Sequence, residues 1–180
     1  MNKLNHKFHI QNFKHSQGLG LIEILISILV LGVGALGVAS MQITGLKYNT
    51  GAYARSQAAL ISSDMMDRMR ANRQLANNPG SLDYEIPVLV NTTGRTIFPT
   101  DCYSTPCSGA EMASFDTWFF LRQIEDQLPF GRGQITIDDT GDQRLYQITI
   151  EWRNVANSQE RDGFTPTDDE LSRFTFSSTL

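Results

Sequence analysis

The sequence predicts an α+β fold, in which one long N-terminal helix packs on a small antiparallel β-sheet that also carries a second, shorter helix. The long helix is predicted because residues 19–76 contain no proline. The first proline of the chain, Pro79, lies in an Asn-Asn-Pro-Gly sequence that is typical of a helix end. The sheet is predicted because apolar and polar residues alternate later in the chain, at 134–137, 145–152 and 173–178.

The first half of the long helix has the length and composition of a membrane span. Residues 24–46 carry no charged side chain, and about 20 residues cross a hydrocarbon core of about 30 Å. Residues 1–18 carry three lysines and three histidines but no acidic residue, a bias that holds a segment in the cytoplasm. We therefore expect a cytoplasmic leader at 1–18, a span at 19–41, and the rest of the chain across the membrane.

Glu23 is the one acidic residue of this apolar segment. An ionised side chain within hydrocarbon costs roughly 2.5–3.5 kcal/mol on insertion scales, so an acid kept there indicates a functional site. A carboxylate and an ammonium in a low dielectric each offset the desolvation cost of the other at close range. The sequence therefore predicts that Glu23 pairs with a cation.

The outer half of the long helix, 42–76, is predicted to be amphipathic. Its apolar residues recur every three or four positions and form a stripe that should pack on the rest of the protein: Ala54, Ala58, Ile61, Met65 and Met69.

The remaining residues, 77–180, are expected to form a globular α+β head. Ser108 and Glu111 have the spacing of a capping box, which predicts a helix that ends at Pro129. We expect one side of this helix to be lined by its large apolar residues, Met112, Phe115, Trp118, Phe119 and Leu128. The acidic segment 138–142 is too short for an EF-hand loop and lacks its terminal glutamate. A hairpin turn is the better interpretation.

The residues around Gly18 resemble a known processing signal. Gly18, Leu19, the Leu-Ile pair at 21–22 and Glu23 resemble the type III signal of type IV pilins and pseudopilins. The resemblance implies that a prepilin peptidase cleaves after Gly18 and that the amine of Leu19 is then methylated. It also implies that Glu23 meets the N-terminal amine of a neighbouring subunit in a filament.

Further segments resemble the PilV-type minor pilins in order and spacing. They are 29–42, 54–59 and 64–73 in the long helix, and then Cys102 and Cys107, Trp118, 128–133 and 146–152. The resemblance implies a single-pass protein of the inner membrane of a Gram-negative bacterium, with its head in the periplasm and later on the pilus. Its implied partners are the prepilin peptidase, other minor pilins, the major pilin and the inner-membrane assembly platform.

Cys102 and Cys107 enclose four residues, which excludes a Cys-X-X-Cys redox motif. In an oxidising periplasm the two would form a short-loop disulfide, with two reduced thiols as the alternative.

Composition argues against catalysis. Cleavage after Gly18 would remove every histidine, the commonest general base, and two cysteines are too few for a structural zinc site. We therefore expect no enzymatic activity, no metal and no cofactor. The whole chain has a net charge of −4, and without its first 18 residues it has 12 basic and 19 acidic residues, or −7. Such an acidic protein is a poor candidate for nucleic-acid binding.

Three other interpretations remain open. A secretory signal peptide would be cut after Ser40, although such signals carry a shorter apolar region and no acid. Within the filament class, the chain can instead be a type II secretion pseudopilin or part of a DNA-uptake pilus. A membrane-tethered periplasmic binding domain would need a span but would have no use for Glu23.

Overall fold

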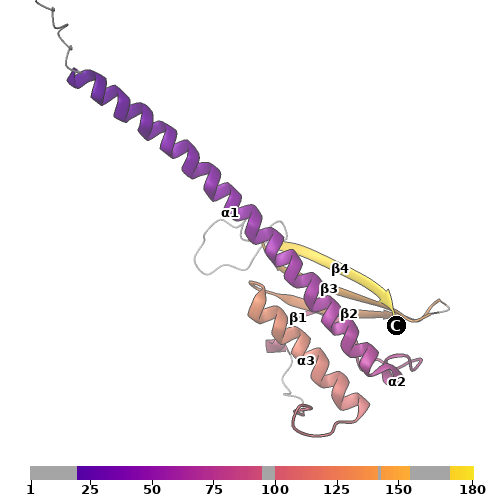
Figure 1. Cartoon of the computed structure of the whole chain (residues 1–180). Helices are drawn as coiled ribbons and strands as arrows, with labels where there is room; N and C mark the ends of the chain where they lie inside the picture. The colour runs from indigo at the N-terminus through magenta and orange to yellow at the C-terminus, as the bar shows by residue number, and fades with distance from the viewer. Residues whose placement is uncertain (1–19, 95–99, 142, 155–170) are drawn as a thin grey trace, which may run out of the picture. The chain divides into compact units, whose positions relative to one another are not determined.

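The computed structural model describes residues 20–94, 100–141, 143–154 and 171–180 (Figure 1). Its helices are α1 (Leu21–Ala71), α2 (Arg73–Ala76), the 3-10 helix η1 (Thr92–Gly94) and α3 (Gly109–Gln127). Its strands are β1 (Ile86–Val90), β2 (Arg132–Asp138), β3 (Leu145–Arg153) and β4 (Leu171–Thr179). A long helix, a further helix and a small antiparallel sheet confirm the predicted α+β class. The chain divides into two units, Met1–Ile43 and Thr44–Leu180, which are described separately.

In the first unit, the described residues form the start of α1. From Leu21 to Ile43 every side chain is exposed, including large apolar ones such as Leu31, which is 75% exposed. Within the described part of the chain, α1 is the one helix that is long and apolar enough to cross a membrane. A helix that is apolar all round needs an apolar environment, and this composition is compatible with a single membrane anchor.

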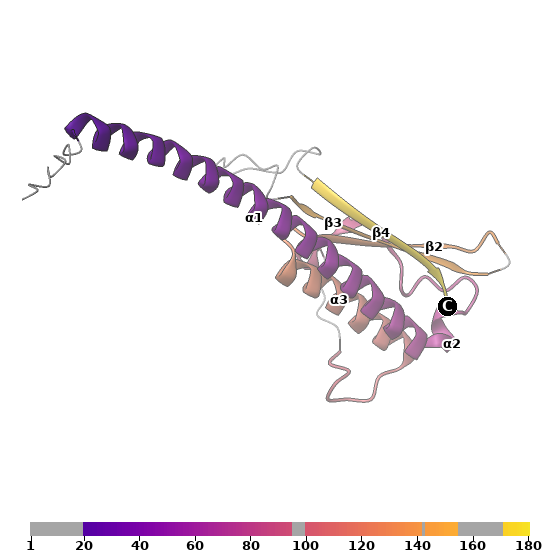
Figure 2. The ribbon, with the colours of Figure 1, turned by 45° about the horizontal axis from the view of Figure 1, so that its top comes forward.

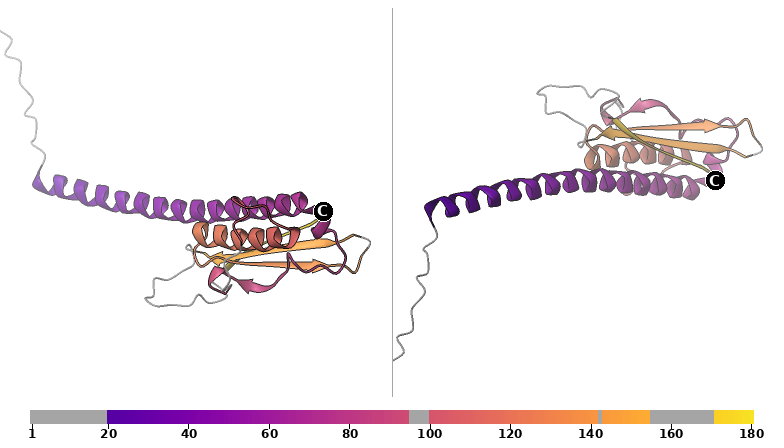
Figure 3. Two further views of the ribbon diagram at one scale, coloured as in Figure 1. Left: turned by 90° about the horizontal axis from the view of Figure 1, so that it is seen from below. Right: turned by 90° about the horizontal axis from the view of Figure 1, so that it is seen from above.

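The second unit is built around a four-stranded antiparallel sheet in the order β1-β2-β3-β4. The second half of α1 and helix α3 lie side by side on one face of this sheet (Figures 2 and 3). The register places Ile135 opposite Ile148, and Ile148 opposite Phe176, so that these apolar side chains share the face toward the helices. The core lies between the two layers and includes Met65, Phe120 and Trp152.

The predicted stripe of the outer half of α1 is confirmed. Ala58, Ile61, Met65 and Met69 are buried, and Ala54 is partly buried against them. The helix does not continue unbroken to residue 76, because Asn72 leaves helical geometry at φ −101° and ψ 39°. Its side-chain amide instead donates to the carbonyl of Gly109 and to the hydroxyl of Tyr84, a type of competing hydrogen bond that makes asparagine a poor interior helix residue.

The capping box at the start of α3 is also confirmed, since Ser108 and Glu111 exchange hydrogen bonds as predicted. The five large apolar residues expected to line one side of this helix are buried to different extents. Phe115 and Leu128 are buried, but Met112, Trp118 and Phe119 are only partly buried. The helix instead buries Phe120, Leu121 and Ile124, because it contacts both α1 and the sheet and therefore needs a wider and rotated apolar face.

Strands β2, β3 and β4 lie where the alternation predicted them; β2 and β4 extend further at both ends, and β3 by one residue at its C-terminal end. Strand β1, which contains Pro87, was not predicted from the sequence. A proline cannot donate to a ladder, but β1 is an edge strand, where that loss is tolerated. The acidic segment after β2 forms the connection to β3, in which the carboxylate of Asp138 accepts from the backbone and hydroxyl of Thr140.

Candidate functional site

Glu23 lies in the first turn of α1. Its backbone N–H donates to the carbonyl of Gly20 over 2.9 Å, and the hydroxyl of Ser27 donates to the carbonyl of Glu23 over 2.7 Å. An acidic side chain at this position is favoured by the positive end of the helix dipole. Among the residues that the structure describes, none forms an ion pair with Glu23. Its carboxylate therefore remains available to a cation from outside this part of the chain.

The predicted cleavage site lies just before this turn. Gly18, Leu19 and the predicted leader fall outside the described residues. Cleavage after Gly18 and methylation of Leu19 therefore stay predictions. The first described residue is Gly20, and α1 begins one residue later at Leu21.

In the head, a buried polar cluster joins α1 to α3. The carboxylate of Asp116, 3% exposed, accepts from Nη1 of Arg68 over 3.1 Å and from the hydroxyl of Tyr84 over 3.1 Å. Arg68 also donates through Nε to Asp64 over 2.8 Å. The amide of Asn72 donates to the same Tyr84 hydroxyl over 3.0 Å. A buried acid and its cation thus satisfy each other, as burial requires.

Burial and hydrogen bonding shift the pKa values of the side chains in this cluster in opposite directions. Burial raises the pKa of Asp116, and the hydrogen bonds from Arg68 and Tyr84 oppose this without cancelling it. Burial also raises the pKa of the Tyr84 hydroxyl. For Arg68, burial would lower the pKa, but hydrogen bonds to Asp64, Tyr103 and Asp116 outweigh it and raise the pKa overall. Arg68 is therefore a permanent cation, and the cluster is suited to holding two helices together rather than to proton transfer.

The segment between the two cysteines is attached to this cluster. The Sγ atoms of Cys102 and Cys107 lie 2.03 Å apart, the distance of a disulfide. Tyr103, inside the loop that they close, packs edge-on against the ring of Phe115, with centroids 5.1 Å apart. Phe119 lies next to both rings, and the guanidinium of Arg68 is 4.3 Å from its centroid. No sequence pattern marked Tyr103 as the contact, because the spacing of residues in a loop does not predict what its side chains touch.

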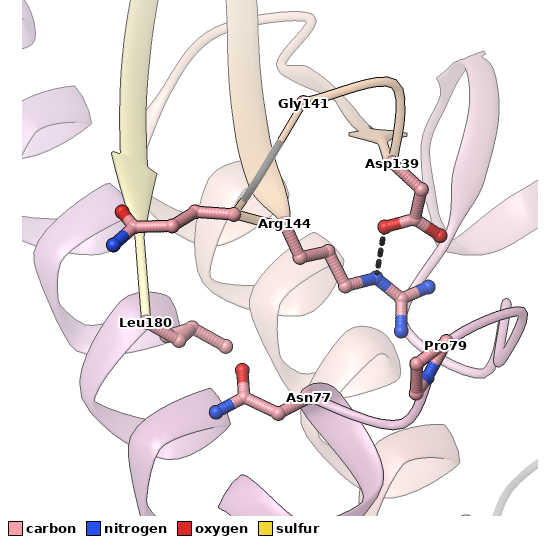
Figure 4. Close-up of a pocket in the computed structure, with 7 residues that line it drawn as sticks. Asn77, Pro79, Asp139, Gly141, Arg144 and Leu180 are labelled. Carbon is pink, nitrogen blue, oxygen red and sulfur yellow. Dashed lines mark ion pairs between the residues drawn. The ribbon is translucent and has the colours of Figure 1, made fainter.

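A second polar cluster surrounds Arg144, close to the end of α2 (Figure 4). Arg144 donates to the carbonyls of Ala76, Asn78 and Ser81, and its Nε lies 3.0 Å from a carboxylate oxygen of Asp139. The cavity here, of about 320 Å³, is also lined by Asn77, Pro79 and Leu180.

Both Nη atoms of Arg144 thus donate hydrogen bonds within the protein, and its buried Nε forms an ion pair with Asp139 but has no hydrogen-bond partner among the described residues. Arg144 therefore fastens the turn after α2 to the β2–β3 connection, and a ligand would have to break these contacts to use it. Among the described residues, no group of three histidine, cysteine or acidic side chains is arranged to hold a metal ion.

These features define a class: an α+β chain that carries a long N-terminal helix, apolar in its first half and packed on a small antiparallel sheet in its second, which is the arrangement of a pilin. Residues 40–118 match the family model Tt1218-like, described as type IV pilin Tt1218. The matched region runs from the end of the apolar segment through β1 and the cysteine loop into α3, and it supports the type IV pilin family. Neither the curated proteins nor the solved structures contain a match to the chain.

Proposed function

We propose that this chain is a minor pilin, a non-enzymatic subunit that takes part in the initiation or tip of a type IV pilus. The observation that carries the proposal is the carboxylate of Glu23, which heads an exposed apolar helix and has no ion-pair partner among the described residues. The family match beginning at residue 40 supports a role in a pilus-related system. The PilV-type resemblance of the sequence supplies the narrower role.

In this proposal, the protein is first inserted in the inner membrane. A prepilin peptidase cleaves after Gly18, and the new amine of Leu19 is methylated, which leaves its positive charge in place. The span keeps the head in the periplasm until other minor pilins and the major pilin join it at the assembly platform. The protein then leaves the membrane as part of the pilus.

The Glu23 carboxylate determines how neighbouring subunits align when they assemble. In lipid, a lone carboxylate and a lone ammonium each carry a desolvation cost that they offset only at close range. When the amine of Leu19 from one subunit reaches Glu23 of the next, both costs fall together. Subunits that are shifted along the helix by a few residues leave both charges unpaired, so the pair sets the register of assembly.

The test uses Glu23→Gln, which keeps the size of the side chain and removes its charge. Membrane insertion should persist or improve, because a membrane charge has been lost, whereas incorporation into pili should fall, because the neighbouring amine is left unpaired. Membrane fractionation and shearing of pili from the same cells measure both quantities. Incorporation of the variant at the wild-type level would contradict the proposal and favour a tethered binding domain, in which the span is only an anchor.

A further inference from the structure

Strand β4 forms one edge of the sheet in the second unit (Figure 2). It pairs with β3 through nine consecutive residues without a bulge, from Leu171 opposite Arg153 to Thr179 opposite Leu145. Within the part of the chain that the structure describes, no strand pairs with the other side of β4. The backbone N–H and C=O groups that point away from β3 are therefore a template for a further strand.

The two edges of this sheet differ in their protection against such pairing. Strand β1 has five residues, contains Pro87 and has an irregular register with β2, and these features discourage pairing with another strand. Strand β4 is longer, contains no proline and carries one charged residue, Arg173. Its threonine and phenylalanine residues favour an extended strand. This long edge, without the devices that protect β1, indicates a pairing surface.

The charged side chain of β4 is directed away from the open edge. Nη2 of Arg173 donates to a carboxylate oxygen of Glu151 on β3 over 2.7 Å. The other oxygen of this carboxylate accepts from Arg132 on β2. Arg173 therefore extends over the interior of the sheet and does not obstruct a strand that approaches β4 from outside.

The aromatic residues of β4 are incompletely covered. Phe174 and Phe176 lie on the face toward the helices, opposite Ile150 and Ile148 of β3. Both isoleucines are fully buried, whereas the two phenylalanines are only partly buried. A further strand with apolar side chains on the same face would remove more of these rings from water, which is favourable in proportion to the apolar area covered.

The residue pattern of β4 is complementary to a second copy of itself. Antiparallel pairing of two copies requires a two-fold axis perpendicular to the sheet, which keeps the helices of both copies on one face. Thr175 is the midpoint of β4, so an axis through it pairs the strand over its whole length. Phe174 of one copy then lies opposite Phe176 of the other, and Arg173 lies opposite Ser177, so that like charges do not meet.

We propose that the edge of β4 joins two copies of this chain as an antiparallel pair centred on Thr175, which makes one continuous sheet of the two heads. The inference goes beyond the proposed function and does not rest on it, because every residue that it uses lies in the second unit. Such a pair covers the open edge of both copies and buries their phenylalanine rings against each other.

Cross-linking of full-length protein in detergent tests the register. The chain has two cysteines, both in the disulfide, so an introduced cysteine supplies the free thiol. Directly opposite residues have Cα atoms about 4.5–5.5 Å apart, a distance that a disulfide spans, so Thr175→Cys should cross-link with copper phenanthroline as the oxidant. Ser177→Cys is the matched control on the same exposed face, because its two copies would lie roughly 14 Å apart along the strands.

A charge at the two-fold axis tests the same pairing at equilibrium. Thr175→Lys places two ammonium groups opposite each other and should raise the dissociation constant of the dimer about fivefold, as measured by sedimentation. Gln147→Lys adds the same charge to an exposed position of β3, away from the edge, and should leave the dissociation constant unchanged. Urea unfolding of both variants checks that the head stays folded.

Three results would overturn the proposal. They are a protein that sediments as a monomer throughout, equal cross-linking at positions 175 and 177, and a dimer that Thr175→Lys weakens no more than Gln147→Lys does. The last result would assign self-association to another surface of the chain. None of these measurements involves Glu23, so the pairing of β4 can fail while Glu23-dependent entry into pili persists, and the reverse outcome is equally distinguishable.

Discussion

The guanidinium of Arg68 lies 3.1 Å from the carboxylate of Asp116, although the two residues are 48 positions apart in the chain. One belongs to α1 and the other to α3, so this ion pair joins the two long helices of the described structure. The side chain of Asp116 is 3% exposed and that of Arg68 is 23% exposed. Loss of either partner would leave the other charge in a poorly solvated site.

Arg68→Met should therefore destabilise the head. Removing one partner of a buried pair leaves an uncompensated charge and costs about 3 kcal/mol. Adding Asp116→Asn to the same protein should recover part of this loss, because no buried charge then remains. Urea unfolding of the full chain in detergent measures both variants.

The control for this experiment is Arg70→Met on the same helix. Arg70 and its partner Asp67 have side chains that are 51% and 72% exposed, so their ion pair should contribute less than about 1 kcal/mol. If Arg68→Met were no more harmful than Arg70→Met, the buried pair would not be what joins α1 to α3.

The capping box of α3 predicts an acid-sensitive contribution to stability. Hydrogen bonds from the backbone N–H and then the hydroxyl of Ser108 lower the pKa of Glu111 below its ordinary value of 4.5. In the window just below that value, the unfolded chain binds more protons than the folded one, so this contribution is present above pH 4.5 and is lost as the pH falls through the folded pKa. Glu111→Gln should unfold at lower urea than the wild type at pH 7, and the difference should shrink at pH 3.

Ser108→Ala provides the second measurement for the same contact, because it removes the hydroxyl and leaves the carboxylate. The stability of this variant should depend less on pH than that of the wild type in the same pH window. A difference between the wild type and Glu111→Gln that stays constant from pH 7 to pH 3 would show that the charge of Glu111 does not assist the cap.

The cysteine pair predicts the absence of free thiols. As the two members of a disulfide, Cys102 and Cys107 should both resist a thiol reagent when the protein is denatured without a reductant. Mass spectrometry of the labelled protein measures this, and quantitative labelling of both residues would refute the disulfide. Cys102→Ser with Cys107→Ser should lower stability by about 2 kcal/mol, the value expected for so short a loop.

The sequence predicted those parts of the head that depend on local pattern. The stripe on α1 and the strands β2, β3 and β4 follow from periodicity, and the start of α3 follows from the capping spacing of Ser108 and Glu111. The elements that were not predicted depend on tertiary contacts. Strand β1 contains Pro87, which local rules disfavour, and it exists because β2 offers an edge with which to pair.

Among the candidate site residues, too, those marked by a local pattern were predicted and those defined by tertiary contacts were not. Glu23 was evident from the sequence because an acid is rare in an apolar segment. The contacts of Asp116 and Arg144 were not, because each side chain meets groups more than 30 positions away in the chain, and no local spacing indicates such pairs.

The last prediction concerns the N-terminus of the mature protein. If a prepilin peptidase cleaves after Gly18, the chain recovered from membranes should begin at Leu19 with a methylated amine, and intact mass with N-terminal sequencing measures both features. Gly18→Phe should block cleavage, because the peptidase site would have to accommodate a side chain beside the scissile bond. The change leaves the span and Glu23 intact, so the uncleaved protein should still insert.

Uncleaved protein that inserts should nevertheless be excluded from pili, since residue 19 would then carry a peptide nitrogen, and no ammonium would be present to meet Glu23 of the neighbouring subunit. Gly18→Ala is the matched control, because a methyl group is a far smaller obstruction and cleavage should persist at a reduced rate. A mature N-terminus at Met41 would instead establish a secretory signal cut after Ser40. It would also contradict the proposed charge pairing of Glu23, because Glu23 would no longer be part of the mature chain.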